Sequence, residues 1–279
     1  MTAVWIFARL TLREASRSRL LALAAGLTLL FLMLLAWGVH TLDTQASYDN
    51  PLDRAVGMAA IDLLSFFVAS FMVAVLAVFV CGASTHSDGE SGLLQAILAR
   101  PVRRMELLAG KWLGSAILLA LYVVLLSLGI SGIVWVASGY LPPHLSEAEA
   151  LLFLEALVML SLRLFFGVFL SNMPSGILPL MLYGLAWMGG LVELIGQQLR
   201  VSALVTAGIV SSLLMPTDIL WRGASYFLQP PEIAIAARAV RGIPFVGQQP
   251  IAAPMVLWAV LYVALIFALG SAIFARRDV

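Results

Sequence analysis

Four ionisable residues lie inside long apolar segments of the chain: Asp62, Glu155, Arg163 and Glu193. Charged side chains are costly in hydrocarbon, so such residues usually face a water-filled path, a partner or a substrate. The three acids are expected towards the outer ends of their spans, where together they would line a vestibule that attracts cations. The simpler interpretation, which we prefer, is that each acid reaches the interface or pairs locally. Arg163 is open to three interpretations: it extends to the inner surface, pairs with another span, or contacts an anionic substrate.

No catalytic motif accompanies these residues. Gly110-Lys111 is followed by Trp112, so the sequence does not match the Gly-x-x-x-x-Gly-Lys-Ser/Thr phosphate loop. It also contains no His-Glu-x-x-His and no Cys-x-x-Cys. Methionines inside the spans would suit Cu(I), but methionine is also an ordinary membrane-core residue, which we prefer as the explanation. We therefore predict no catalytic, cofactor-binding or metal-binding residue on this chain. If ATP drives the protein, ATP and magnesium bind to another chain.

The composition indicates a membrane protein. Hydrophobic residues make up 62% of the chain and charged residues 11%, far from the balance of a soluble domain. The net charge of +1 gives no basis for a nucleic-acid partner. A single cysteine, Cys81, excludes an internal disulfide framework. Several apolar segments reach the roughly 20 residues that a membrane helix needs.

We predict an all-α polytopic fold with six transmembrane helices in a single transmembrane domain over residues 1–279. An amphipathic helix over residues 3–19, with Arg9, Arg13 and Arg17 at helical spacing, is expected to lie in the membrane interface before the first span. The predicted spans cover about residues 20–40, 60–83, 109–138, 150–171, 176–196 and 252–274.

The segment 197–251 is predicted to be re-entrant or extracytoplasmic. Residues 201–215 are apolar but short for a span, and a seventh crossing would place Arg276 and Arg277 outside. Pro216 is expected to end this helix. Thr217 or Asp218 is then expected to cap a second helix that runs to about Leu228.

Basic residues predict the orientation. With both termini in the cytoplasm, most arginines fall on the inner side, and four of the five outer ones lie in the long segment 197–251. The inner residues would be Arg9, Arg13, Arg17, Arg19, Arg100, Arg103, Arg104, Lys111, Arg276 and Arg277.

A polar stretch, residues 84–112, separates the second and third spans. Ser87 and Glu90 have the spacing of a capping box, and residues 91–99 are predicted to form a short helix. Its apolar side carries Leu93, Leu94 and Ile97. By composition alone, this helix is equally well a docking site for a soluble partner or an ordinary cytoplasmic loop.

The stretch resembles the first cytoplasmic loop of type-2 ABC exporter permeases. The resemblance rests on Glu90, Gly92, the Leu-rich helix, Arg100-Pro101, Arg103-Arg104 and Gly110-Lys111. It implies that residues 84–106 are a coupling loop that docks on a separate ATP-hydrolysing subunit, and that two permease chains form a homodimer. The implied docking residues are Ser87, Glu90, Leu93, Leu94, Ile97, Arg103 and Arg104, the last two anchored at lipid phosphate. The implied location is a bacterial cytoplasmic membrane.

Residues 215–222 add a partial similarity to the permease of the nitrous oxide reductase maturation system. That family has an Asn-Pro-Thr-Asp-x-x-Arg stretch, whereas here Met215 replaces the asparagine and Arg222 falls one residue later. The similarity allows an extracytoplasmic accessory protein as a further partner. The alternative function is a secondary transporter or channel that needs no ATPase, with Asp62, Glu155, Arg163 and Glu193 on its substrate path.

Overall fold

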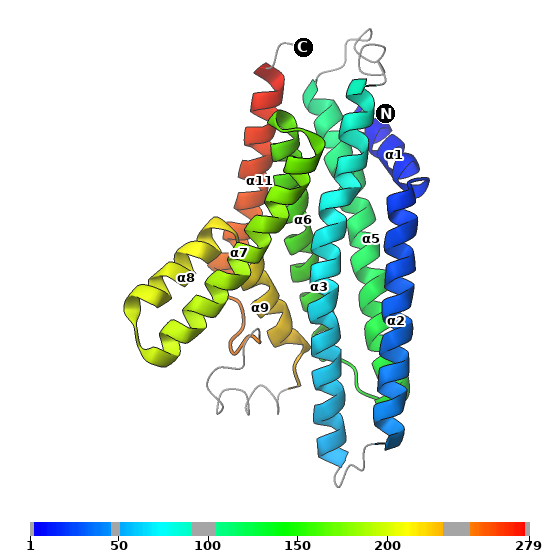
Figure 1. The fold of residues 1–279 in the computed structure, drawn as a ribbon, viewed down its shortest axis with the longest axis vertical. Coiled ribbons are helices and arrows are strands. Elements are labelled where there is room, and N and C mark those ends of the chain that lie inside the picture. Colours follow the sequence, from blue (N-terminus) through cyan, green and yellow to red (C-terminus); the bar gives the residue numbers. More distant parts are fainter. Residues whose placement is uncertain (1–2, 46–50, 91–103, 231–245, 277–279) are drawn as a thin grey trace.

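The computed structural model describes residues 3–45, 51–90, 104–230 and 246–276, and no strand occurs among them (Figure 1). Within these residues, six helices are long and apolar enough to cross a membrane. Each predicted span coincides with one of them, although α3 extends nine and seven residues beyond the predicted limits 60–83, and the architecture is that expected of a helical, multi-pass membrane protein. They are α2 (Arg19–Gln45), α3 (Pro51–Glu90), α5 (Arg104–Ser138), α6 (Leu145–Phe169), α7 (Asn172–Leu199) and α11 (Ala253–Arg276).

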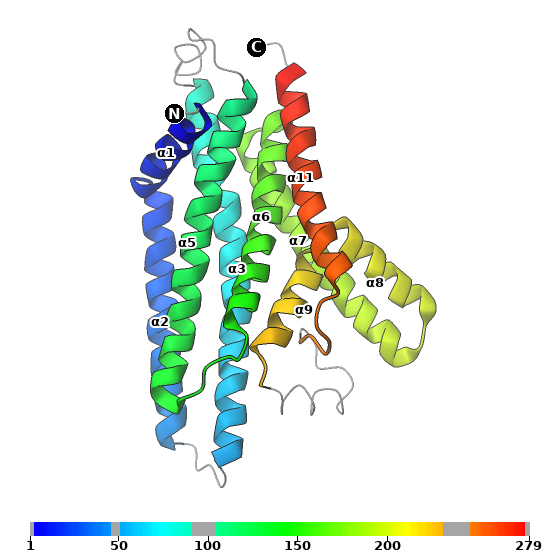
Figure 2. The same ribbon diagram turned by 180° about the vertical axis from the view of Figure 1, so that it is seen from behind.

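Helix α6 lies at the centre of the bundle. In the most apolar 18-residue stretch of α6, 67% is buried. In the corresponding stretch of α2, which runs along the outside, 6% is buried. Helices α3, α5 and α11 pack around α6, and α7 crosses the bundle obliquely (Figures 1 and 2). The beginning of α1 and the end of α11 lie at the same end of the bundle (Figures 1 and 2). A chain that crosses a membrane an even number of times, such as six, has both of its ends on the same side.

The predicted interfacial helix is present as α1 (Ala3–Ser16), which ends slightly before the predicted limit. Ala8 and Thr11 are buried against α5, whereas Trp5, Ile6 and Leu10 are exposed. The contact is close because α5 presents Gly110 and Gly114 at this point: a Cβ at Gly110 would clash with Phe7 and the carbonyl of Val4. The glycine of the Gly110-Lys111 pair therefore holds α1 against the bundle.

Two short helices, α8 (Ser202–Leu214) and α9 (Thr217–Leu228), follow α7 and meet at an angle of 95°. Helices α7 and α8 form a hairpin that projects from the bundle, whereas α9 returns towards α6 (Figures 1 and 2). Pro216 separates them as predicted, but it is itself the N-cap residue of α9, with no side-chain cap. The predicted cap by Thr217 or Asp218 is therefore wrong, because the Asp218 carboxylate pairs instead with Arg222 one turn later.

The predicted coupling loop, residues 84–106, is bounded differently in the structure. Helix α3 continues through Glu90 and α5 begins at Arg104. Ser87 and Glu90 therefore lie in the last part of α3 and do not begin a new helix. Polar residues alone do not end a helix, and no proline follows Pro51 in the sequence until Pro101.

The rest of the predicted docking site lies outside the described residues. This applies to Leu93, Leu94, Ile97 and Arg103 and to the short helix expected over residues 91–99. The side chains of Ser87, Glu90 and Arg104 are likewise outside the description, although their backbone is helical.

Candidate functional site

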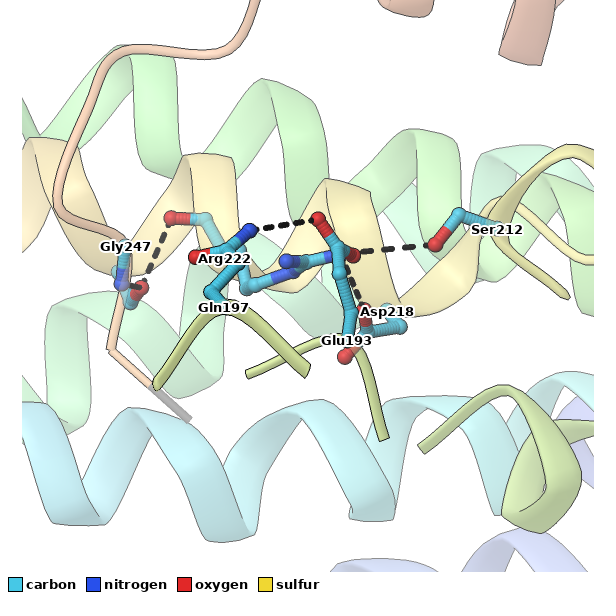
Figure 3. A network of polar contacts seen from close by, with 7 residues as sticks. Glu193, Gln197, Ser212, Asp218, Arg222 and Gly247 are labelled. Carbon is cyan, nitrogen blue, oxygen red and sulfur yellow. Dashed lines mark hydrogen bonds and ion pairs between the residues drawn. The ribbon is translucent and has the colours of Figure 1, made fainter. Parts of the chain in front are cut away.

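A network of charged and polar side chains joins α7, α8 and α9, with Arg222 at its centre (Figure 3). The Nη2 atom of Arg222 donates a hydrogen bond to Oε2 of Glu193 at 2.8 Å. The same atom lies 2.8 Å from Oδ2 of Asp218 and 3.5 Å from Oγ of Ser212. One guanidinium therefore holds two carboxylates. With all three groups ionised, the junction has a net charge of −1.

The network is largely shielded from the surroundings. The side chains of Asp218, Glu193 and Arg222 are 5%, 13% and 26% exposed. Gln197 donates a further hydrogen bond from Nε2 to Oε1 of Glu193 at 3.1 Å. Both oxygens of Glu193 therefore accept a hydrogen bond, whereas Oδ2 of Asp218 and Nε of Arg222 have no hydrogen-bond partner among the described residues.

Asp218 reaches Arg222 only because α7 has no side chain at Gly190. A Cβ at that position would clash with both carboxylate oxygens of Asp218. The four-residue spacing of Asp218 and Arg222 in α9 also brings their side chains together, since residues four apart lie on the same face of a helix. Position 190 therefore allows the acid to sit between α7 and α9.

The network extends to the chain segment that precedes α11. The hydroxyl of Ser225 donates to the carbonyl oxygen of Arg222 and accepts a hydrogen bond from the backbone N–H of Gly247, both at 2.8 Å. Gln229 donates from Nε2 to the carbonyl oxygen of Gly247 at 3.1 Å. A cavity of about 360 Å³ lies here, bordered by Glu193, Gln197, Arg222 and the segment 246–252.

A second polar cluster lies inside the bundle, where Glu155 of α6 is fully buried. Its Oε1 accepts a hydrogen bond from Ser70 of α3 at 2.9 Å. The Ser70 hydroxyl is also 3.0 Å from the hydroxyl of Tyr183 on α7. Three spans are thus joined by one polar contact chain.

Aromatic side chains adjoin this second cluster. The ring of Phe67 packs edge-on against Trp187 and Trp221, with centroids 4.7 and 5.6 Å away. Trp187 in turn lies 6.4 Å from Tyr183. Trp221 is almost completely buried.

The structure places Asp62 differently from either expectation. Its side chain is fully buried in α3, so it does not reach the interface. Neither carboxylate oxygen has a hydrogen-bond partner among the residues that the structure describes. An isolated carboxylate is very costly in such a site, which favours a neutral, protonated carboxyl or a partner that arrives when the bundle changes shape.

Arg163 is buried and binds within the chain. Its Nε donates to the carbonyl oxygen of Val78 at 3.2 Å, and Nη2 donates to Oδ1 of Asn172 at 2.6 Å. Nη1 donates to Oγ of Ser175. Of the three interpretations of Arg163, the structure favours pairing between spans, because α3, α6 and the start of α7 meet at this guanidinium.

Of the four residues singled out in the sequence, Glu193 pairs with a side chain of opposite charge, that of Arg222. The contacts made by Glu155, Arg163 and Glu193 do not join them into one vestibule. Ser70 and Tyr183 escape sequence analysis, because a serine or tyrosine in an apolar span carries no distinctive signal. Asp218 and Arg222 do carry one, the four-residue spacing after Pro216.

No protein-family model matches the chain, and no curated protein matches its sequence. Within the described residues, no group of three or more His, Cys, Asp or Glu side chains is placed to hold a metal ion. The geometry instead offers a charged junction between α7 and α9, and a separate buried acid on α6.

Proposed function

We propose that this chain is the membrane-spanning permease subunit of an ATP-driven exporter of the ABC-2 type. The observation that carries the proposal is the order of the elements. An amphipathic α1 precedes six candidate spans, and a sharply bent helix pair lies between the fifth and the sixth. The sequence of residues 84–112 adds the resemblance to the coupling loop of that family.

The energy would come from another subunit, because the sequence has no phosphate loop. ATP and magnesium would bind there, and closure of an ATPase pair would push on residues 84–106. Leu93, Leu94 and Ile97 would contact the ATPase. Helices α3 and α5, which flank this stretch, would transmit the movement into the bundle.

Two copies of the chain would enclose the substrate path. The junction of Arg222 with Glu193 and Asp218 would act as a latch between α7 and α9, and Asp62 and Glu155 would be the acids exposed as the bundle opens. Both termini would be cytoplasmic, in a bacterial cytoplasmic membrane, and transport would run outwards. An extracytoplasmic accessory protein would be an additional partner.

A pull-down tests the docking. Tagged protein is purified from its native membrane in mild detergent, and its partners are identified by mass spectrometry. We expect a stoichiometric ATPase with the unmodified chain and none with Leu94→Asp. Leu141→Asp is the control: it makes the same chemical change on an exposed leucine in the α5–α6 connection, at the opposite end of the bundle (Figure 1).

The alternative is a secondary transporter, which the unpartnered carboxyl of Asp62 favours. It predicts that purified chain in liposomes transports under an ion gradient alone and loses this activity with Asp62→Asn. Such a result, together with the absence of an ATPase from the pull-down, would replace the proposed function.

A further inference from the structure

A groove runs along α1, α2 and α3 on the outside of the bundle, formed by two adjoining cavities. One is about 380 Å³ and lies where α1 turns into α2. The other is about 250 Å³ and lies between α2 and α3. Leu20, Leu76 and Phe79 border both cavities, so the two adjoin along one face of the bundle.

The end of the groove beside α1 combines apolar side chains with the polar residues of the α1–α2 turn. Arg17, Ser18 and Thr11 border it, and the exposed side chains of Arg13 and Arg19 lie beside Arg17 in the sequence. Glu14 also borders this end, so one acidic side chain lies among the three arginines. The local excess of arginine favours an anionic group.

The end between α2 and α3 is apolar. Leu23, Leu27 and Phe71 line it and are more than half exposed at 69%, 58% and 56%. Among the residues that border this cavity, Tyr122 alone has a polar side chain, and its hydroxyl is already 2.8 Å from the hydroxyl of Thr28. This end therefore suits a hydrocarbon chain and offers no hydrogen bond to a polar ligand.

Helix α1 places the two ends at different depths. It exposes Trp5, Ile6 and Leu10 together with arginines, the composition of a helix that lies in the membrane interface. The basic end of the groove is then at the level of lipid headgroups. The apolar end follows α2 into the level of the acyl chains, so polarity changes along the groove as it does along a phospholipid.

We propose that this groove is a binding site for one anionic phospholipid of the leaflet on which α1 lies. The phosphate would sit beside Arg17, and one acyl chain would follow α2 past Leu23 towards Phe71. This lipid would be a resident ligand that joins α1 to α2 and α3, separate from any transported substrate. The proposal does not depend on the proposed transport function.

Native mass spectrometry of the full chain tests the proposal. The protein is exchanged into detergent with equal amounts of phosphatidylglycerol and phosphatidylcholine, and the lipids retained per chain are counted. We expect one tightly held phosphatidylglycerol. Arg17→Gln should weaken its retention about fivefold, the worth of one basic residue at a membrane surface. Arg9→Gln, which changes an exposed arginine of α1 that does not border the groove, should have little effect.

A second pair of variants tests the apolar end. Leu23→Trp should fill the groove and abolish retention of the lipid. Leu29→Trp makes the same change on an exposed face of α2 away from both cavities and should leave retention unchanged. Equal retention by these two variants, or equal retention of both lipids with no effect of Arg17→Gln, would overturn the proposal.

Discussion

The Nη2 atom of Arg222 lies 2.8 Å from Oε2 of Glu193, which joins α9 to α7 across 29 positions of the chain. Because Asp218 approaches the same atom at 2.8 Å, the junction has two acids for one base. Such a junction is stable while it is closed, and it leaves two neighbouring carboxylates unpaired if the guanidinium is withdrawn. A displacement of α9 that separates Arg222 from the two acids would therefore have a large electrostatic cost.

Removing the base should destabilise the protein strongly. Arg222→Met keeps much of the side-chain volume but leaves Glu193 and Asp218 without their partner. We expect a loss of about 3 kcal/mol in the free energy of unfolding, as for other shielded ion pairs that lose one partner. Thermal unfolding of the purified chain in detergent measures the loss.

The matched control is the triple variant Arg222→Met, Glu193→Gln, Asp218→Asn. It removes the acids together with the base, so it should recover most of the lost stability. A triple variant as unstable as Arg222→Met alone would show that Arg222 acts through packing and not through its charge.

Gly190→Ala should force Asp218 away from Arg222. The new Cβ would clash with the Asp218 carboxylate, and an overpacked contact of this kind costs about 1–3 kcal/mol. Gly184→Ala is the control on the same helix, since a Cβ at Gly184 meets nothing within 4 Å. In an Asp218→Ala background the effect of Gly190→Ala should disappear. An unchanged effect in that background would assign the clash to another group.

Gly110→Val should detach α1 from the bundle. The added side chain would clash with Phe7 and the backbone of Val4. Trypsin should then cleave after Arg13 and Arg17 faster than in the unmodified chain. Gly132→Val is the control on the same α5 helix, since a Cβ at Gly132 meets no atom within 4 Å. Trypsin should cleave this variant at the same rate as the unmodified chain. Identical digestion of the two variants would contradict the contact between α1 and α5.

Arg163→Met should loosen the α6–α7 turn. The variant loses three hydrogen bonds from one buried cation, to Val78, Asn172 and Ser175. We expect a loss of at least about 2 kcal/mol in the free energy of unfolding. Arg163→Lys should recover only part of it, because one ammonium cannot reach all three acceptors. The exposed Arg200→Met should leave the unfolding temperature unchanged.

Much of the fold follows from the sequence by itself. The six spans are determined by apolar length, because only helices of about 20 apolar residues satisfy every backbone group within a bilayer. Pro216 predicts the break between α8 and α9, and helical spacing predicts that Asp218 and Arg222 share a face. These are local properties, which depend on residues within a few turns of each other.

The candidate site was decided only by the tertiary structure. Glu155 meets Ser70 across 85 positions, and Ser70 meets Tyr183 across 113. Such contacts depend on how whole helices cross, and many crossings bury the same apolar surface, so no local pattern selects among them. For the same reason, the sequence shows that Glu193 is an acid within a span but does not show that Arg222 is its partner. It also explains Arg163, whose three acceptors meet only where α3 and α7 converge on α6.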